Sequence, residues 1–431
     1  MTFLDQLDPD ALMRLQQTLL AEHSALKARG LRLNIARGKP SREQLDLSNA
    51  MLSILRADDC VTAAGDDARN YGGDHQGVFE LRELFSPLLG APPEQIVAGG
   101  NSSLSMMHDV ITWALLKGIP GSTEPWSRLR DLTFICPAPG YELHHKICEE
   151  FGIHLLPVPV TPDGPDMDIV EMLTADQNVK GMWCVPTYAN PTGEIYSQDV
   201  VARLAAMKTG ASDFRLFWDD AYVVHHLGDK PHSTTKILDA CLRAGNPDRP
   251  FVFSSTSKIT FAGAGVGFLA ASAANVAWYV DRVRRRGPGP DKLNQLRHVR
   301  FLKDADGLRR HMEAHRAILA PKFATLLQAF EHRLKDRGVA QWSCPEGGYF
   351  ISIETRAGAA RRTVALAQEA GVTLTTAGST WPHGNDPKDS NIRIAPSFAS
   401  IEDVEVAAEV IALSILLAAI EVLGKKAFCP A

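Results

Sequence analysis

Several residues whose side chains could act together lie directly after short apolar runs in this sequence. Lys258 follows an apolar run and four small hydroxylated residues. Asp219 and Tyr222 follow an earlier run, and Asn190 follows one earlier still. Pyridoxal phosphate (PLP) chemistry needs an amine for a Schiff base, an acid beside the pyridinium nitrogen, and donors for the phenolic oxygen and the phosphate. These residue types, in these positions, therefore predict a PLP site.

Lys258 taken alone could equally be an exposed surface lysine. At a strand end, beside the hydroxyls of Ser255 and Ser257, its amine can form a Schiff base with the cofactor. Once released, the same amine can carry the proton between the substrate Cα and the cofactor carbon C4′. We therefore expect Lys258 to be catalytic.

Two adjacent acids compete for the place beside the pyridine nitrogen. Trp218 ends the apolar run, so the carboxylate of Asp219 is expected at the edge of the sheet. A buried carboxylate there would keep the ring nitrogen protonated and the ring a strong electron sink. Asp220 is the alternative acid, with a helix N-cap as its structural role. Tyr222 and Asn190 can each donate to the phenolic oxygen, although Asn190 also begins a sequence typical of turns.

A glycine-rich turn predicts the phosphate-binding cradle. Gly100, Asn101 and Ser102 lie between an apolar run and a helical stretch, and backbone N–H groups at a helix start bind phosphate. Ser255 and Ser257 can add hydroxyl donors.

Two further residues have the chemistry to contact the cofactor ring and the substrate. Tyr141 follows another apolar run and can stack on the pyridine ring, or it can be a core aromatic residue. Arg393 lies in an apolar stretch and can bind a carboxylate through two parallel hydrogen bonds. A surface ion pair is the alternative role for Arg393.

The elements that must position these residues follow a regular alternation. Apolar runs that end in Gly, Pro, Asn, Asp or Ser clusters are followed by helical spans, and seven such runs occur, at 95–98, 132–136, 153–160, 181–185, 215–218, 251–253 and 266–271. This alternation predicts an α/β fold with a mostly parallel seven-stranded sheet and helices on both of its faces. Ligands of such sheets bind at the carboxyl ends of the strands, where most of the candidate residues lie.

Helices are expected on either side of this region. Residues 8–28 predict a helix that Asp8 caps and Pro9 begins. A long helix from Asp304 to about Arg337 leads into a strand at 349–354. We therefore expect a large PLP-binding domain at 50–300 and a smaller α+β domain built from 1–49 and 301–431.

Composition excludes several classes of protein. The chain has 431 residues, of which 45% are hydrophobic and 22% charged, as in ordinary globular proteins. Its formal net charge of −5 at pH 7 argues against nucleic acid or an anionic membrane as the main partner. The seven cysteines form no CxxC pair, so we expect reduced thiols in a cytoplasmic protein, and neither a disulfide frame nor a metal site: Cys60, Cys136, Cys148, Cys184, Cys241, Cys344 and Cys429.

Neither terminus predicts a targeting or membrane segment. Residues 1–10 are acidic and lack the basic start of a signal peptide. The uncharged stretch 410–420 is shorter than the ~20 residues that a spanning helix needs, so we expect a buried C-terminal helix.

Together these motifs resemble the class I/II, fold-type I PLP-dependent aminotransferases over nearly the whole chain, from about Gly38 to Ser397. The resemblance is carried by Tyr71 with 77–82, by 100–102, 139–141 and 190–193, by Asp219-x-x-Tyr222 and Ser255-x-Ser257-Lys258, and by Arg393. Details at 36–40, 69–73 and 257–263 resemble the MocR-type subgroup of aspartate aminotransferases.

The resemblance implies a role for each cofactor-binding residue. Lys258 would be the Schiff-base lysine and Asp219 the partner of the pyridinium nitrogen. Asn190 and Tyr222 would bind the phenolic oxygen, and Tyr141 would stack on the ring.

The resemblance also implies contacts with the substrate and between subunits. Arg393 would bind the substrate α-carboxylate, assisted by the backbone of Gly38. Tyr71 would reach the phosphate of the neighbouring subunit, which implies a homodimer with shared active sites. A distal carboxylate would need a second cation, for which Arg37, Lys39 and the cluster 284–286 are candidates.

The sequence departs from the family pattern in two places. Most members have a phosphate-binding arginine about eight residues after the lysine, but 259–267 contains none, so another group or the helix dipole must serve. Ala377 stands where a proline often precedes the glycine. MocR-type regulators also carry a winged-helix domain, for which the 37 residues before Gly38 are too few, so we do not expect a transcription factor.

Three functions are open at this stage. The first is an aminotransferase that moves the amino group of an acidic amino acid, aspartate or glutamate, to a 2-oxo acid by a ping-pong reaction through Lys258. The second is a PLP-dependent β-lyase or other amino-acid lyase, because the same lysine and aspartate serve both reactions. The third is a catalytically silent, effector-binding protein on the same fold.

Overall fold

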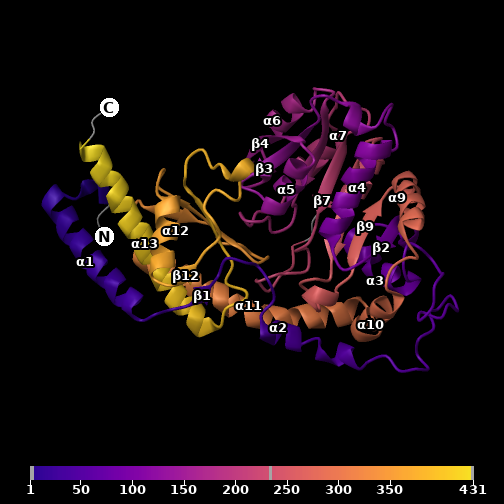
Figure 1. Cartoon of the computed structure of the whole chain (residues 1–431), viewed down its shortest axis with the longest axis horizontal. Coiled ribbons are helices and arrows are strands. Elements are labelled where there is room, and N and C mark those ends of the chain that lie inside the picture. Colours follow the sequence, from indigo (N-terminus) through magenta and orange to yellow (C-terminus); the bar gives the residue numbers. More distant parts are fainter. Residues whose placement is uncertain (1–3, 233–234, 429–431) are drawn as a thin grey trace.

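The seven apolar runs all form strands of one central sheet. These strands are β2 (Ile96–Ala98), β3 (Thr133–Ala138), β4 (His154–Thr161), β6 (Val179–Cys184), β7 (Arg215–Asp219), β8 (Pro250–Ser255) and β9 (Gly267–Ala271). A short edge strand, β5 (Gly164–Pro165), makes the sheet eight-stranded where seven strands were predicted. The strand order is β2-β9-β8-β7-β6-β3-β4-β5 in the computed structural model, which describes residues 4–232 and 235–428 (Figure 1).

The middle of this sheet is parallel and its edges are antiparallel. Strands β4, β3, β6, β7 and β8 run parallel to one another. At the edges, β9 is antiparallel to both β8 and β2, and β5 is antiparallel to β4. The parallel strands read as continuous apolar runs because helices bury both of their faces. The carboxyl ends of β6, β7 and β8 therefore lie side by side, where Asn190, Asp219 and Lys258 follow them.

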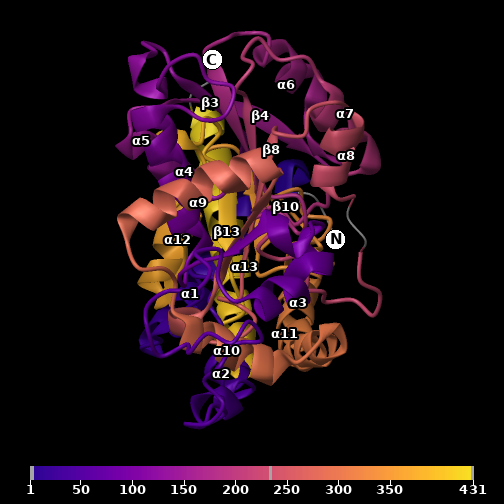
Figure 2. The same cartoon turned by 90° about the vertical axis from the view of Figure 1, so that its right-hand side faces the viewer.

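Alternate residues of each strand enter two different cores. On β7, Leu216 and Trp218 pack with residues from α3 (Phe79–Leu89), α6 (Met167–Leu173), α7 (Gln198–Ala206), α8 (Ile237–Arg243) and α10 (Lys292–Leu302). Phe217 packs on the opposite face with α4 (Ser103–Lys117), α5 (Glu142–Glu150) and α9 (Ala273–Arg286). Figure 2 shows α9 crossing in front of α4 on this second face. The period of two along the strands thus produces the predicted three layers.

A second group of elements packs around two small sheets (Figure 1). β10 (Ala340–Trp342), β11 (Ile351–Thr355) and β13 (Asn391–Ile394) form one sheet, and β1 (Leu33–Asn34) pairs with β12 (Val372–Thr373) in the other. The helices α1 (Pro9–Ala28), α12 (Ala360–Glu369) and α13 (Ile401–Phe428) share one hydrophobic core with these strands. This arrangement is the expected α+β unit, and the boundaries predicted at 50 and 300 stay a prediction.

Two predicted helices occur close to their expected bounds. Asp8 caps α1, and its Oδ1 accepts a hydrogen bond from the Ala11 amide at 2.7 Å. The long helix α11 spans Ala305–Leu334 and contributes Leu308 and Met312 to the large core and Phe323, Leu326 and Phe330 to the small one. A single helix therefore joins the two groups of elements.

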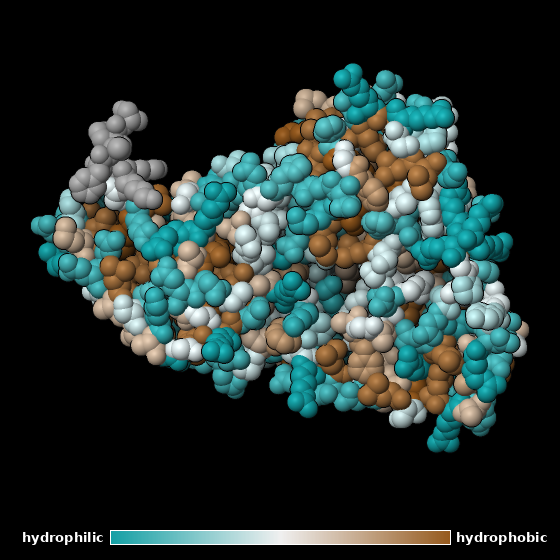
Figure 3. Space-filling view, in the orientation of Figure 1, coloured by the Kyte–Doolittle hydropathy of each residue, from teal (hydrophilic) through white to brown (hydrophobic). Residues whose placement is uncertain are grey.

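The C-terminal helix is a core helix. Residues Ile401–Gly424 of α13 are long and apolar enough to cross a membrane, but 72% of the most apolar window is buried within the protein. It packs against α1, α11 and α12. On the face of the molecule that Figure 3 shows, hydrophilic and apolar side chains are intermixed. The prediction of a buried C-terminal helix is confirmed.

The cysteines are thiols wherever the structure describes them. Five are buried and Cys344 is exposed, and none of these six is in a disulfide. Cys429 lies outside the described residues.

A substitution in α13 tests its role as a core helix. Leu416 is 1% exposed, so Leu416→Ala should lower the free energy of unfolding by about 2–5 kcal/mol through lost burial and a cavity. Leu242→Ala, at a leucine that is 63% exposed, should change it by at most about 0.5 kcal/mol. Urea denaturation of both variants measures the difference, and equal effects would contradict the core position of α13.

Candidate active site

Lys258 lies in the turn after β8 and is partly buried. Burial lowers the pKa of the Lys258 amine, and the nearby Asp219 carboxylate opposes this effect. The amine lies 4.9 Å from the centre of the Tyr222 ring. The structure thus brings the lysine, which follows one apolar run, together with the acid and the phenol, which follow another.

Asp219 is the last residue of β7 and is 4% exposed. Its Oδ2 lies 3.0 Å from Nε2 of His144, and the His144 ring stacks on Trp183 with the ring centres 4.2 Å apart. Its Oδ1 is buried and has no hydrogen-bond partner. One oxygen of this carboxylate is thus fixed, and the other is left for a donor.

Asp220 is also buried, but its neighbours differ. Burial raises the pKa of Asp220 to about 6, with the Thr187 hydroxyl and Lys236 acting in the opposite direction. Its Oδ1, like that of Asp219, has no partner. The negative charge of Asp219 shifts the pKa of the Lys258 amine and of the Tyr141 and Tyr222 hydroxyls, as well as that of Asp220. Asp219 is therefore the acid that faces the candidate site.

Both tyrosines predicted to contact the cofactor lie near Asp219. Burial raises the pKa of Tyr222 well above its ordinary value, and Tyr141, Asp219 and Arg393 are among the groups that act on it. Tyr141 precedes α5, and the centre of its ring lies 4.9 Å from the centre of the His144 ring. Burial also raises the pKa of the Tyr141 hydroxyl. Both phenols therefore remain protonated donors at neutral pH.

The predicted phosphate cradle lies at the start of α4. Ser102 caps this helix, and its Oγ accepts from the Ser105 amide at 3.3 Å. The Ser257 hydroxyl donates to the Asn101 carbonyl at 3.3 Å, and the Ser255 hydroxyl accepts from the Ser257 amide at 3.4 Å. The cradle and the turn that carries Lys258 are therefore in direct contact.

Backbone packs closely around the position where the arginine is missing. Gly267, the first residue of β9, donates its amide hydrogen to the Gly100 carbonyl at 2.6 Å. A Cβ at Gly267 would come within 2.9 Å of the Ser102–Ser103 backbone. A Cβ at Gly265 would lie 3.1 Å from the Thr256 hydroxyl. Gly265 and Gly267, which flank Val266, thus lie against the cradle and the Lys258 turn with little room for a side chain.

Arg393 lies on β13 and is 4% exposed. Its Nη1 donates to Oδ1 of Asn190 at 3.3 Å, and its Nη2 donates to Oε2 of Glu142 at 3.1 Å. Its guanidinium lies 4.8 Å from the centre of the Phe350 ring, and a Cβ at Gly38 would come within 2.5 Å of that ring. The three predicted substrate contacts Arg393, Asn190 and Gly38 are therefore grouped together.

Other predicted residues are not tied to this group. Tyr71 is 84% exposed, on a loop that precedes α3. Arg37 is exposed and adjoins Gly38, and Lys39 lies over the Phe398 ring. Arg286, at the end of α9, pairs with Asp109 and lines a cavity beside the cradle rather than the surroundings of Arg393.

Several residues near the site escaped the sequence analysis. Glu142 and His144 lie in the first turn of α5, one and three residues after Tyr141. Their closeness to Tyr141 in the sequence was the feature that could have identified them. The Lys258 carbonyl accepts from Nε2 of His225 at 3.2 Å and from the Tyr349 hydroxyl at 3.4 Å. Burial lowers the pKa of His225 to about 3, so its ring is neutral there.

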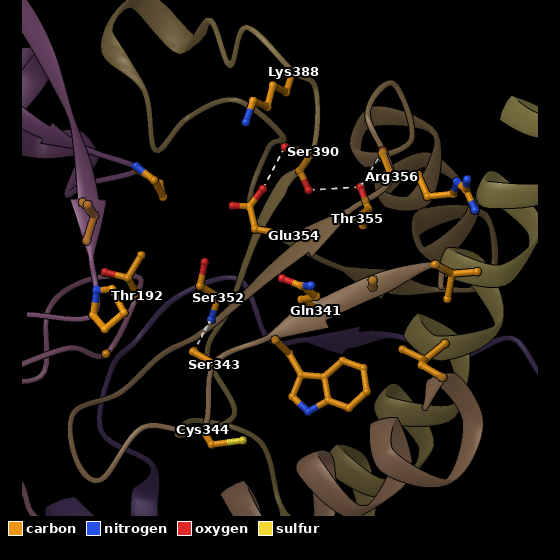
Figure 4. Close-up of a pocket in the computed structure, with 18 of the residues that line it drawn as sticks. Thr192, Gln341, Ser343, Cys344, Ser352, Glu354, Thr355, Arg356, Lys388 and Ser390 are labelled. Atoms are coloured by element: carbon orange, nitrogen blue, oxygen red, sulfur yellow. Dashed lines mark hydrogen bonds between the residues drawn. The ribbon is translucent and has the colours of Figure 1, made fainter. Parts of the chain in front are cut away.

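A large groove lies beside this site and is distinct from it. It has a volume of about 1290 Å³ and extends between Thr192–Glu194 and the sheet of β10, β11 and β13. Ser390 donates to Glu354 within it at 2.7 Å (Figure 4). Its lining includes neither Lys258 nor Arg393, so we do not assign catalysis to it.

Comparison with known proteins agrees with this geometry. A sequence profile described as aspartate amino-transferase matches residues 7–427. A Corynebacterium glutamicum protein named aspartate aminotransferase is 46% identical over 418 residues, which cover 97% of this chain and 96% of the relative. A Mycolicibacterium smegmatis protein named as an aminotransferase is 52% identical over 415 residues, which cover 94% and 97%.

Solved structures agree with the fold. The crystal structure of an aspartate transaminase from Corynebacterium glutamicum has a TM-score of 0.95 at 46% identity and covers 97% of this chain and 99% of that one. The α-aminoadipate aminotransferase of Thermus thermophilus has a TM-score of 0.73 at 21% identity, covers 92% and 95%, and shows the fold alone. The predicted fold class is confirmed. The relatives named here are not regulators, so the resemblance to the MocR-type subgroup is not confirmed. The chain belongs to the aspartate amino-transferase family and is a fold-type I aminotransferase.

Proposed function

We propose that this chain uses PLP to move the amino group of an acidic amino acid, aspartate or glutamate, to a 2-oxo acid in a ping-pong reaction. The observation that carries the proposal is the buried Lys258 amine beside Asp219, whose Oδ1 lacks a partner. A protonated ring nitrogen is the kind of donor that this oxygen lacks. Bound PLP would supply the electron sink for the pair left at the substrate Cα.

The surrounding residues suit the other parts of the cofactor. Asn190 and Tyr222 offer donors for the phenolic oxygen, and Tyr141 offers a ring for stacking. The phosphate would be held by the start of α4 and by neighbouring hydroxyls, with the helix dipole supplying part of the positive potential. The residues that would do so are Gly100, Asn101, Ser102, Ser255 and Ser257.

The lysine and its acid have separable tasks. Because burial lowers the pKa of Lys258, more of its amine is neutral and nucleophilic than for a lysine in water. The free amine would then take the proton from the substrate Cα and return it. Asp219 would hold the proton on the ring nitrogen, and His144 would keep the carboxylate oriented through Oδ2.

Arg393 and a relative support the proposed substrate class. A buried guanidinium favours a carboxylate because it can make two parallel hydrogen bonds to it. The name of the Corynebacterium glutamicum relative, aspartate aminotransferase, supports an acidic amino acid. For the distal carboxylate we propose Arg37, since it is exposed and adjoins Gly38 next to the Phe350–Arg393 group.

We also propose a cytoplasmic homodimer with shared active sites. The supporting observation is Tyr71, an aromatic residue that is 84% exposed and therefore available to a neighbouring copy.

The amino-donor half-reaction tests the proposed function. Addition of L-aspartate or L-glutamate to the PLP-loaded protein, without any 2-oxo acid, should convert the visible absorbance to that of pyridoxamine phosphate. The reason is that the first half of a ping-pong reaction leaves the amino group on the cofactor. Absorbance that stays constant with both amino acids would exclude the acidic substrate. Release of pyruvate and ammonia from a serine or cysteine derivative, without amino transfer, would support a lyase instead.

Replacement of the lysine tests its role directly. Lys258→Ala should lower the transamination rate by at least about 10³-fold, because it removes both the nucleophile and the proton carrier. PLP should remain weakly bound through the other contacts, which ultrafiltration and absorbance can measure. Lys208→Ala, at an exposed lysine, is the matched control and should behave as wild type. A Lys258→Ala variant with the wild-type rate would refute the assignment.

A pair of variants separates the two adjacent acids. Asp219→Asn should lower the half-reaction rate by about 10²-fold, because a neutral amide cannot keep the ring nitrogen protonated. Asp220→Asn should have a much smaller effect, since the charge that acts on Lys258, Tyr141 and Tyr222 is that of Asp219. Single-turnover kinetics distinguish the two. The reverse order of effects would assign the role to Asp220.

A further inference from the structure

The arginine proposed to bind the substrate already holds a carboxylate of this chain. Nη2 of Arg393 donates to Oε2 of Glu142 at 3.1 Å. Glu142 is the first residue of α5, directly after Tyr141, and nothing in the cofactor chemistry uses it. An incoming α-carboxylate must compete for the same guanidinium.

We propose that Glu142 is a specificity-determining residue that occupies Arg393 until a substrate carboxylate displaces it. The inference rests on the proposed function, because it requires Arg393 to be the carboxylate-binding residue. Glu142 thus lowers the affinity of the site for every acid. Glu142 also excludes neutral ligands, because these carry no carboxylate that could replace it in the ion pair with Arg393.

The geometry makes the exchange feasible. The only hydrogen bond between the described parts of the two side chains joins Nη2 to Oε2, whereas a free carboxylate can make two parallel bonds to a guanidinium. Nε of Arg393 is buried without a partner, so the guanidinium retains unused donor capacity. The Arg393 side chain is 4% exposed and cannot be left without an anion at low cost.

Glu142 can leave more easily than Arg393 can. Its side chain is 29% exposed, so water can solvate it after displacement. Its place in the first turn of α5 also gives a free carboxylate a favourable interaction with the helix dipole. Displacement therefore replaces the Glu142 carboxylate at Arg393 by that of the substrate. The released Glu142 carboxylate remains stabilised by water and by the helix dipole of α5.

Binding of an unreactive acid to the PLP-loaded protein tests the proposal. Succinate should bind Glu142→Gln about fivefold more tightly than the wild type, because the amide no longer competes as a charged group. Isothermal titration calorimetry measures this affinity without turnover. Glu150→Gln removes a charge from the exposed end of the same helix and should leave the affinity unchanged. A far-ultraviolet circular dichroism spectrum that matches the wild type in each variant shows that the fold is retained.

Two outcomes would overturn the proposal while leaving the proposed function intact. Weaker succinate binding in Glu142→Gln would mean that Glu142 only positions Arg393, and equal binding would mean that the pair does not compete. Arg393→Ala separates these from failure of the proposed function. If Arg393→Ala also binds succinate as well as the wild type, Arg393 is not the carboxylate site, and the substrate assignment and the role of Glu142 both fail.

Discussion

The burial of the Lys258 amine beside the Asp219 carboxylate is the constraint on which the rest of the site depends. An amine removed from water loses hydration, and only nearby negative charge makes its protonated form tolerable. The neighbouring parallel strands β7 and β8 provide the arrangement, because Asp219 ends one and Lys258 follows the other. A separation of 39 residues in sequence becomes proximity because parallel strands end at the same edge.

The position of this lysine is also fixed from the second group of elements. Its carbonyl accepts from Tyr349, which precedes β11, and the Ile259 carbonyl accepts from His311 on α11 at 2.6 Å. Gln44 links Tyr349 to His315 through hydrogen bonds of 2.9 and 3.0 Å. The backbone of the turn at Lys258 and Ile259 is therefore hydrogen-bonded to the long helix α11 and to the residue before β11. Movement between the two groups of elements would change the position of the lysine.

The sequence predicted the strands and the grouping of the candidate residues because both depend on local signals. Strands buried on two faces must be continuous apolar runs, and the residues after them must lie at one edge. The two-residue strand β5 has no such run and was missed. His144 and Glu142 were missed because their partners Asp219 and Arg393 lie 75 and 251 residues away, so spacing could not reveal the pairs. The roles of Tyr71 and Arg37 depend on a neighbouring copy and on a ligand, which no local pattern specifies.

Asp219 and Glu142 differ in their burial and in their hydrogen-bond partners. This difference decides which of the two carboxylates a substrate can displace. Asp219 lies near the Lys258 amine and Glu142 pairs with the buried Arg393, so an arriving acid adds a negative charge unless one carboxylate moves away. The Asp219 side chain is 6% exposed and is held by His144, whereas the Glu142 side chain is 29% exposed at a helix start. Removal of a buried, hydrogen-bonded charge costs more than release of one that water can reach. Under the proposed function, charge balance would therefore be restored at Glu142, and Asp219 would keep its place beside the cofactor nitrogen.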